Sequence, residues 1–343
     1  MKMKKKIASA LLLGAVGVSV VGCSNSPSEE KDDKIELSYA FFAPDNTFPA
    51  EQMKKFEKEV EKRTDGKVDV QLYTGGTLLQ AENMYDGVKN GVADIGLSSP
   101  TYEQGKYPLL ELEAMPMGIP NSKVGTKVLN DLMKEHKPEA MKDFEVITAF
   151  SGEPAYIQST KDVSSLANLK NQQLRISGSN QDVLSAIQVS PVGMSQSEVP
   201  EAIQTAVIDG NVSSREVLKD FQLAEHEKYV LDYPLSTTSF VAVMNESKYN
   251  SLPKDVQKVI TEVGQEMSDY AAEYHDNQIK DIMDWSKKEQ GVKVQSLSAK
   301  EKQELDKIYE KLVKAKINDL EDEGVAAQEY YEKMQELIEK HTK

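Results

Sequence analysis

The chain has 343 residues, of which 41 are basic and 56 acidic, and its formal net charge is −15 at pH 7. A surface of this sign repels phosphates and anionic lipid headgroups, so we expect neither nucleic acid nor a membrane surface as a direct partner. The length exceeds what one hydrophobic core usually covers, and we expect two lobes. Cys23 is the single cysteine, which excludes an intrachain disulfide and a CxxC metal site.

The N-terminus has the pattern of a secretory signal peptide. Four lysines precede the apolar run Ile7 to Val21, which is too short for a membrane-spanning helix of ~20 residues. The run ends in a lipobox, Val20-Val21-Gly22-Cys23, although a chance cysteine near an ordinary cleavage site is the alternative. We predict a lipoprotein signal peptide over residues 1–22, lipidation of Cys23 with palmitate, a polar tether over 23–34, and an extracytoplasmic protein held to the cell membrane only by its lipid.

The next segment predicts three βα units. Alternating apolar residues predict strands over 35–41, 68–72 and 94–97. Helical spacing predicts one helix that stops at Asp65-Gly66 and another over 79–90. Strands and helices in this order indicate a parallel sheet with right-handed crossovers.

The loops after these strands are the expected binding loops of the first lobe. They contain five candidate ligand-binding residues, namely Phe42, Tyr73, Ser98, Ser99 and Tyr102. The alternative for the aromatic residues is that they pack inside the lobe. If they line a cleft, the ligand has an apolar or aromatic body.

The pattern between the lobes is less regular. Residues 107–120 are interpreted as a proline-broken connector, 122–136 as a helix and 144–150 as a strand. The chain is expected to cross into the second lobe near 151–153. Tyr156 lies just beyond this crossing, and it either closes over the ligand or only packs against neighbouring side chains.

The stretch 166–214 is predicted to contain the binding chemistry. We expect four elements, which are a strand over 172–177, a helix over 180–188, a strand over 190–194 and a helix over 198–207. A turn is expected at Ile208-Asp209-Gly210, beside Asn211, Ser213 and Ser214. In a β-α-β-α run the strand ends and turns lie at one rim, so Arg175 and a turn over 211–214 are expected to converge on one ligand.

Arg175 is the strongest candidate anchor, because the chain has only three arginines. A guanidinium group binds a carboxylate through two parallel hydrogen bonds, which a lysine cannot do. The alternative is an exposed arginine at a strand end. Gln196, just after the second strand of this stretch, completes the candidate set.

The C-terminal part begins with a strand over 236–244 that returns to the first lobe. Residues 253–290 predict one helix of roughly 57 Å, with Pro253 in its first turn and Gly291 at its end. A five-residue step in its apolar stripe fits one helix that packs on both lobes; a kink or two helices is the alternative. A strand over 292–295 and helices over 298–320 and 325–339 close the chain. We assign residues 35–151 and about 240–278 to lobe I, and 152–239 and about 279–343 to lobe II.

Two segments, LANLKNQQLRIS and SPVGMSQSEVPEAIQTAVIDG, resemble the solute-binding subunits of TRAP (tripartite ATP-independent periplasmic) transporters. The resemblance extends to FVAVMNESKYNSLPKDVQKVI and the long helix after it. It implies a two-lobed α/β fold of the periplasmic-binding-protein type, with a long helix spanning both lobes. It also implies capture of a small organic acid in the inter-lobe cleft, with Arg175 on the ligand carboxylate, and delivery to the membrane permease subunits of a TRAP transporter.

Two departures from the family pattern concern the ligand. Asn211, Val212 and Ser213 replace a glutamine-glutamate-asparagine sequence, so Ser213 occupies the place of a common amide ligand. A second arginine of many members is absent from SGEPAYIQST. These departures argue against a doubly anchored dicarboxylate or a sialic acid. Phe42 and Ser99 fall where other members place polar ligand contacts.

No catalytic motif is present. The four histidines are isolated, and the sequence contains no HExxH, Walker, GxGxxG or GxSxG pattern. We therefore predict no catalytic residue, metal or cofactor, and a monomer that is not an enzyme. The alternatives are a ligand-sensing subunit for a membrane receptor and, less favoured, a bilobal enzyme.

Overall fold

The first three strands form the parallel sheet that the sequence predicts. In the computed structural model, which describes residues 34–170 and 172–343, β1 (Ile35–Phe41) lies between β2 (Val68–Tyr73) and β3 (Ile95–Ser98) and is parallel to both. The crossovers are α1 (Phe48–Arg63) and α2 (Met84–Lys89). The predicted signal peptide, Cys23 and nearly all of the predicted tether lie outside the described residues.

Two long antiparallel strands connect this sheet to a second one. They are β4 (Phe144–Ser159) and β9 (Ser236–Asn245), which pair along most of their length. The register between them shifts between Ser151 and Pro154, where the chain was expected to cross. The predicted strand over 144–150 is therefore too short, because β4 continues through the crossing as a strand of 16 residues.

The second sheet region extends from the end of β4. Its strands are β5 (Gln173–Ile176), β6 (Ser190–Gly193), β7 (Gly210–Ser213), β8 (Tyr229–Leu231) and β10 (Lys293–Gln295). The main path through the whole sheet is β2-β1-β3-β9-β4-β7-β5-β6, and β8 joins β10 to β4. Short helices lie between these strands, namely α5 (Leu166–Leu169), α6 (Gln181–Ser185), α7 (Val199–Gln204) and α8 (Val217–Asp220).

Two predictions about local structure are wrong. Residues 211–213 belong to strand β7 and not to a turn, because they pair with β4 on one side and with β5 on the other. Gly210 permits this close approach, since a Cβ there would lie 2.2 Å from the Gln158 carbonyl oxygen. The connector over 107–120 contains a helix, α3 (Pro108–Glu113), because proline at the first helical position begins a helix instead of breaking it.

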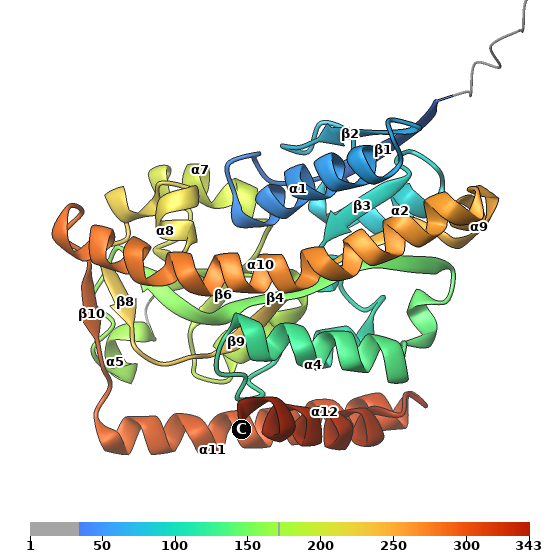
Figure 1. Cartoon of the computed structure of the whole chain (residues 1–343). Coiled ribbons are helices and arrows are strands. Elements are labelled where there is room, and N and C mark those ends of the chain that lie inside the picture. Colours follow the sequence, from blue (N-terminus) through green and yellow to red (C-terminus); the bar gives the residue numbers. More distant parts are fainter. Residues whose placement is uncertain (1–33, 171) are drawn as a thin grey trace, which may run out of the picture. The chain divides into compact units, whose positions relative to one another are not determined.

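The long helix is confirmed as one continuous element. Helix α10 (Lys254–Lys288) has 35 residues and follows α9 (Glu246–Ser251). Figure 1 shows α10 running past β4, and it packs against α1, α4 (Ser122–Glu135), α8 and β4. Gly264 lies so close to β4 that a Cβ would be 2.0 Å from the Ile147 carbonyl oxygen.

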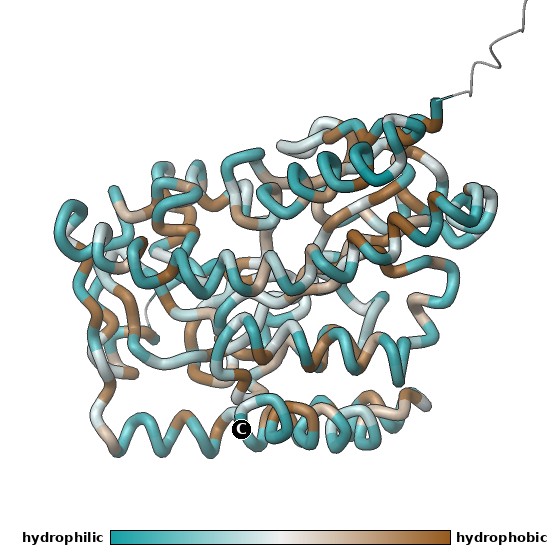
Figure 2. The backbone as a smooth tube through the Cα atoms, in the orientation of Figure 1, coloured by the Kyte–Doolittle hydropathy of each residue, from teal (hydrophilic) through white to brown (hydrophobic). Residues whose placement is uncertain are grey.

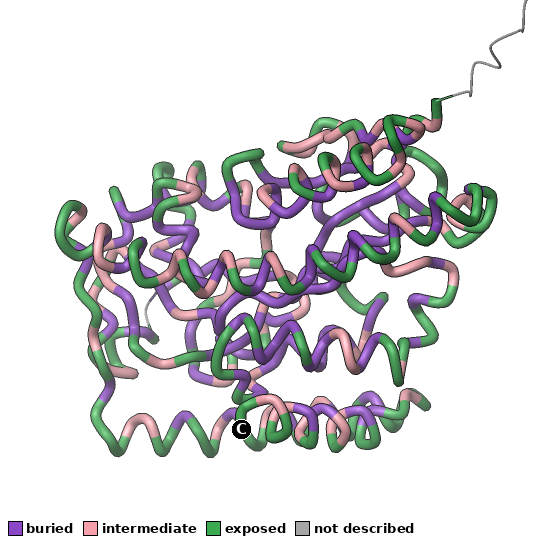
Figure 3. Tube along the Cα trace, viewed as in Figure 1, coloured by how far each residue is buried: buried purple, intermediate pink, exposed green. Residues whose placement is uncertain are grey.

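The last two helices cover one side of this structure. Helices α11 (Ala299–Asp322) and α12 (Ala327–Thr342) lie along α4 in Figure 1. Both alternate hydrophilic with hydrophobic residues (Figure 2) and exposed with buried ones (Figure 3). Their buried residues pack partly on α3 and α4 and partly on the second sheet region, as Met334 and Leu305 illustrate. The boundaries between the lobes stay a prediction.

Candidate functional site

Five of the predicted ligand-binding residues line one cavity, which lies at the carboxyl ends of strands from both sheet regions. They are Phe42, Tyr102, Arg175, Gln196 and Ser213. Phe42 and Tyr102 follow β1 and β3, whereas the other three lie on or after β5, β6 and β7. The strand ends therefore converge as expected for this topology.

The cavity volume is about 30 Å³. Such a space holds about one water molecule, whereas ligand sites usually measure ~300–1,000 Å³. A ligand of more than a few atoms therefore requires the two walls to move apart.

Arg175 is held in the cavity by three short hydrogen bonds. Its Nε donates to the Met194 carbonyl at 2.9 Å, one terminal nitrogen donates to Gln196 Oε1 at 2.7 Å, and the other donates to the Tyr102 hydroxyl at 3.0 Å. A fourth contact, to the Val212 carbonyl, is long at 3.5 Å. Since the guanidinium has five N–H groups, two remain free or weakly held among the described residues.

The charge of Arg175 has no counter-ion in contact. The residue is 3% exposed, and its hydrogen-bond partners are all neutral. No carboxylate within residues 34–170 and 172–343 lies within 4 Å of it. A buried charge is costly unless it is paired, so this position is prepared for an anion.

Gln196 offers a second donor beside Arg175. Its Oε1 accepts from Arg175, which fixes the amide so that Nε2 is left as the donor. Gln196 is 6% exposed, and in the described part of the chain Nε2 has no hydrogen-bond partner. An anion bound to Arg175 therefore has a neutral donor within the same cavity.

Aromatic rings form much of the remaining wall. Phe42 packs edge-on against Tyr102, with ring centroids 5.1 Å apart. Sequence reasoning missed three further rings that line the cavity, namely Phe48, Phe221 and Phe240. Phe48 begins a helix and Phe221 follows the last residue of one, so neither lies at the end of a strand, where ligand-binding residues were expected.

Three first-lobe candidates lie outside this cavity. Ser98 and Ser99 are fully buried, and their hydroxyls are used by the Ala81 carbonyl and the Thr101 hydroxyl. Tyr73 donates to Gln71 on its own strand. Local partners thus satisfy these side chains.

Two second-lobe candidates also point elsewhere. Asn211 donates to both carboxylate oxygens of Glu227, at 2.8 and 2.9 Å. Burial raises the pKa of Glu227 to about 8. The guanidinium carbon of Arg215 lies 4.2 Å from the centroid of the Tyr156 ring, and Arg215 is paired with Glu153.

The same cavity is also lined by two acidic residues, Glu216 and Asp220. Glu216 is 5% exposed, accepts a hydrogen bond from the Ser214 hydroxyl at 2.6 Å, and lies 2.9 Å from His275 Nε2. His275 Nδ1 accepts the backbone N–H of Glu153, which indicates that Nε2 carries the proton. Asp220 Oδ2 accepts the backbone N–H of Phe48 at 3.1 Å. Burial, with the neighbouring Glu216, raises the pKa of Asp220 to about 7.

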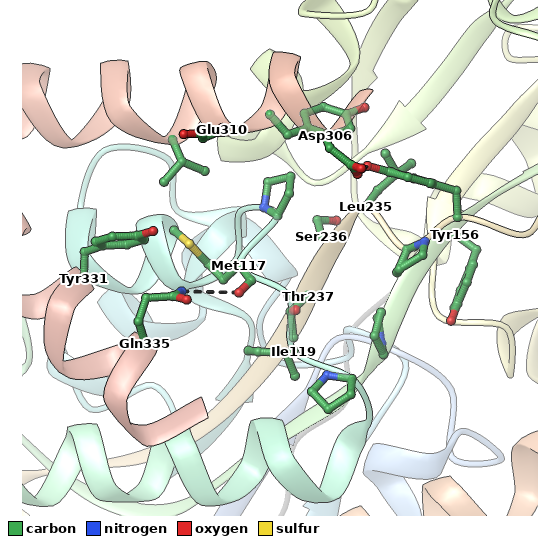
Figure 4. A pocket seen from close by; sticks show the side chains of 18 of the residues that line it. Met117, Ile119, Tyr156, Leu235, Ser236, Thr237, Asp306, Glu310, Tyr331 and Gln335 are labelled. Carbon is green, nitrogen blue, oxygen red and sulfur yellow. Dashed lines mark hydrogen bonds between the residues drawn. The ribbon is translucent and has the colours of Figure 1, made fainter. Parts of the chain in front are cut away.

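A larger cavity of about 440 Å³ lies between the last two helices and the ends of the connecting strands (Figure 4). Tyr156, Asp306, Glu310, Tyr331 and Gln335 are among its lining residues. Lys314 is the one basic side chain among the described residues that line it, and this lysine is exposed and paired with Glu310 at 2.7 Å. This cavity therefore lacks the uncompensated buried charge that distinguishes the cavity around Arg175.

Within the described ranges no three His, Cys, Asp or Glu side chains are grouped to hold a metal ion. None of the helices in this part of the chain has the length and apolarity needed to cross a membrane.

Comparison with known proteins identifies the family. Residues 39–319 match DctP, the bacterial extracellular solute-binding protein family 7. The chain belongs to this family. The predicted relationship to TRAP solute-binding subunits and the predicted fold class are confirmed, and the extracytoplasmic location agrees with the family.

Several relatives of this family 7 protein are informative. It is 36% identical to a TRAP periplasmic solute-binding protein of Desulfovibrio salexigens, with a TM-score of 0.79 over 90% of this chain and 96% of that one. It is 26% identical to a marine metagenome TRAP solute-binding protein specific for aromatic acid ligands, solved with metahydroxyphenylacetate, with a TM-score of 0.85 over 90% and 100% of the chains. The C4-dicarboxylate-binding protein DctB of Bacillus subtilis is 21% identical over 300 residues, 82% of this chain and 83% of that protein.

Proposed function

We propose that this protein captures an organic anion through a carboxylate bound to Arg175 and delivers it to a TRAP-type membrane permease. The observation that carries the proposal is the buried guanidinium, whose partners in the described part of the chain are all neutral. A ligand carboxylate supplies the missing negative charge, and Gln196 Nε2 and the Ser213 hydroxyl offer further donors.

The body of the ligand is proposed to be apolar or aromatic. Phe42, Phe48, Tyr102 and Phe221 surround the cavity, and aromatic walls of this kind are typical of sites that enclose apolar ligands. The marine relative is specific for aromatic acids, which agrees with this chemistry. DctB is named for C4-dicarboxylates, so the family alone does not select the ligand.

Capture is proposed to couple to movement of the two walls. Tyr102 follows a strand of the first sheet region and Arg175 belongs to the second, and their hydrogen bond of 3.0 Å joins the walls. A ligand that contacts both walls only when they are together binds that arrangement more tightly, and its differential affinity shifts the population toward it.

The proposed protein is a monomer that a covalently attached lipid anchors to the membrane. The signal peptide over residues 1–22 is proposed to direct export, and lipidation at Cys23 is proposed to hold the protein at the outer surface of the cell membrane. In this arrangement the acidic protein is tethered near its permease without binding lipid headgroups.

A thermal-shift screen tests the proposed function. The purified protein is heated with monocarboxylates, dicarboxylates, aromatic acids, sulfonates and neutral sugars, because a saturating ligand raises the melting temperature through mass action. We expect stabilisation by carboxylates that is lost in Arg175→Ala and kept in Arg63→Ala, since Arg63 pairs with Glu59 and Glu266 away from the cavity. Stabilisation by sugars alone would contradict the proposal.

A further inference from the structure

The cavity around Arg175 has an uneven charge. Arg175 is its only basic lining residue within the described chain, whereas Glu216 and Asp220 of the α8 segment are acidic lining residues. A ligand with two carboxylates therefore finds one cation and two acidic side chains. This arrangement distinguishes between anions that share a carboxylate but differ at the other end.

The basic and acidic groups that line the cavity have separate hydrogen-bond partners. Arg175 bonds to Met194, Gln196 and Tyr102, whereas the acidic residues bond to a different set, Ser214, His275 and Phe48. In the part of the chain that the structure describes, Arg175 forms no ion pair with either carboxylate. Apolar side chains that include Ile176, Val217 and Phe221 also line the space.

Asp220 has an acceptor to offer a ligand. Its Oδ2 accepts the Phe48 N–H, and no donor to Oδ1 is present among residues 34–170 and 172–343. The side chain is half-buried, so a bound ligand can reach it. Glu216 differs, because its two oxygens are engaged by Ser214 and His275.

We propose, on the basis of the carboxylate-capture function above, that the ligand is a monocarboxylate whose far end carries a hydrogen-bond donor, a hydroxyl or an amine. Asp220 accepts that donor. Glu216 and Asp220 together exclude ligands with a second carboxylate at this end, since like charges brought together in a water-poor site repel each other strongly.

The ionisation of Asp220 decides the pH at which this selectivity is measured. Glu216 and Lys219 act on it from its own segment, and His275 acts on it from α10. Burial, together with nearby charges that include Asp220, raises the pKa of Tyr274 of α10. Because burial and Glu216 raise the pKa of Asp220 to about 7, the carboxylate is mainly ionised at pH 8. Selectivity against a second carboxylate is therefore strongest at pH 8 and declines at pH 6.

The test is isothermal titration calorimetry of the purified protein at pH 8 with matched ligands. One series is benzoate, 3-hydroxybenzoate, 3-(aminomethyl)benzoate and isophthalate, which differ only in the meta group. A phenylacetate series with the same four meta groups and an aliphatic series of butyrate, 4-hydroxybutyrate, 4-aminobutyrate and succinate widen the choice of skeleton. Within a skeleton that binds, we expect the hydroxyl or amine compound to bind at least tenfold tighter than the dicarboxylate.

The variant Asp220→Asn tests the residue itself. Asparagine keeps an oxygen for the Phe48 N–H but removes the charge, so the affinity of the dicarboxylate relative to the hydroxyl compound is expected to rise at least tenfold. Asp319→Asn removes one negative charge from an exposed position on α11 and is expected to leave this ratio unchanged.

The outcomes separate this inference from the proposed function. If Arg175-dependent binding is found and isophthalate binds as tightly as 3-hydroxybenzoate at pH 8, the inference is overturned while carboxylate capture stands. The inference is also overturned, and carboxylate capture stands, if Asp220→Asn leaves the affinity of the dicarboxylate relative to the hydroxyl compound at its wild-type value. If no compound of the three series binds, the inference and the proposed ligand class fail together. The wild-type comparison decides the matter even if the variant does not fold.

Discussion

Removal of the guanidinium in Arg175→Ala is the most direct perturbation of the proposed site. The structure leaves two N–H groups of Arg175 free or weakly held, enough for a bidentate contact with a carboxylate. In the variant the ligand charge enters the same enclosed site without a cation. The variant is therefore expected to lose affinity for every carboxylate ligand.

The size of the loss follows from the burial of the site. Truncating one partner of a buried charge pair costs ~2–5 kcal/mol, which corresponds to a 30- to 5,000-fold increase in Kd. Arg175→Lys keeps the charge but cannot form two parallel hydrogen bonds, so its loss is expected to be smaller. The variant is also expected to lose some stability, because the Met194 carbonyl and the buried Gln196 Oε1 lose the donor that Arg175 provides.

Calorimetric titration with a carboxylate found in the screen measures these losses. Urea unfolding of the same preparations establishes that the variants are folded, and Arg63→Ala serves as the matched control. The control removes an arginine whose partners, Glu59 and Glu266, lie outside the cavity. A Kd for Arg175→Ala within threefold of the wild-type value would refute the assignment of Arg175 as the anchor.

Three further predictions concern other parts of the chain. Because burial raises the pKa of Glu227 to about 8 from 4.5, the folded state binds a proton that the unfolded state releases, and stability falls as pH rises from 4.5 to 8. In Glu227→Gln this fall should be weaker, and urea unfolding at pH 9 should show a gain of up to ~3 kcal/mol in the free energy of unfolding. An unchanged pH profile would contradict the assignment of Glu227 as a buried acid. Gly264→Ala places a methyl group against the Ile147 carbonyl and should lower the free energy of unfolding by ~2–4 kcal/mol. The control Gln265→Ala, at an exposed position, should change it by less than ~0.5 kcal/mol. Equal values for the two variants would argue against the close approach of α10 and β4. Cys23→Ser should release the protein from the membrane fraction, as immunoblotting of cell fractions would show, and continued membrane association would argue against the lipid anchor.

The regular elements were largely predictable, because they depend on local pattern. Alternation gave β1 and β2, and helical spacing between Pro253 and Gly291 gave α10 as one helix. The errors occurred where local pattern is ambiguous. Pro108 begins α3 in a segment expected to lack a helix, and Gly210 opens strand β7 where a turn was expected.

The candidate site was predictable in part. The scarcity of arginine and the strand-end position indicated Arg175, and the structure places Phe42, Tyr102, Gln196 and Ser213 beside it. These residues follow strands whose ends meet at one rim, and that convergence is a property of the topology.

Local pattern in the sequence was sufficient for most strands and helices, for the charge of the chain and for one arginine near the end of a strand. Which polar side chains remain available to a ligand depends on the folded arrangement of the chain. Ser99 and Asn211 lie close to strand ends, but the Ser99 hydroxyl bonds to Thr101 and the Asn211 amide nitrogen donates to Glu227. Asp220 enters the cavity because α8 meets the start of α1, 172 residues away in sequence. Periodicity and turn chemistry act over a few residues, whereas the partner of a buried polar group is set by segments that meet only in the folded chain.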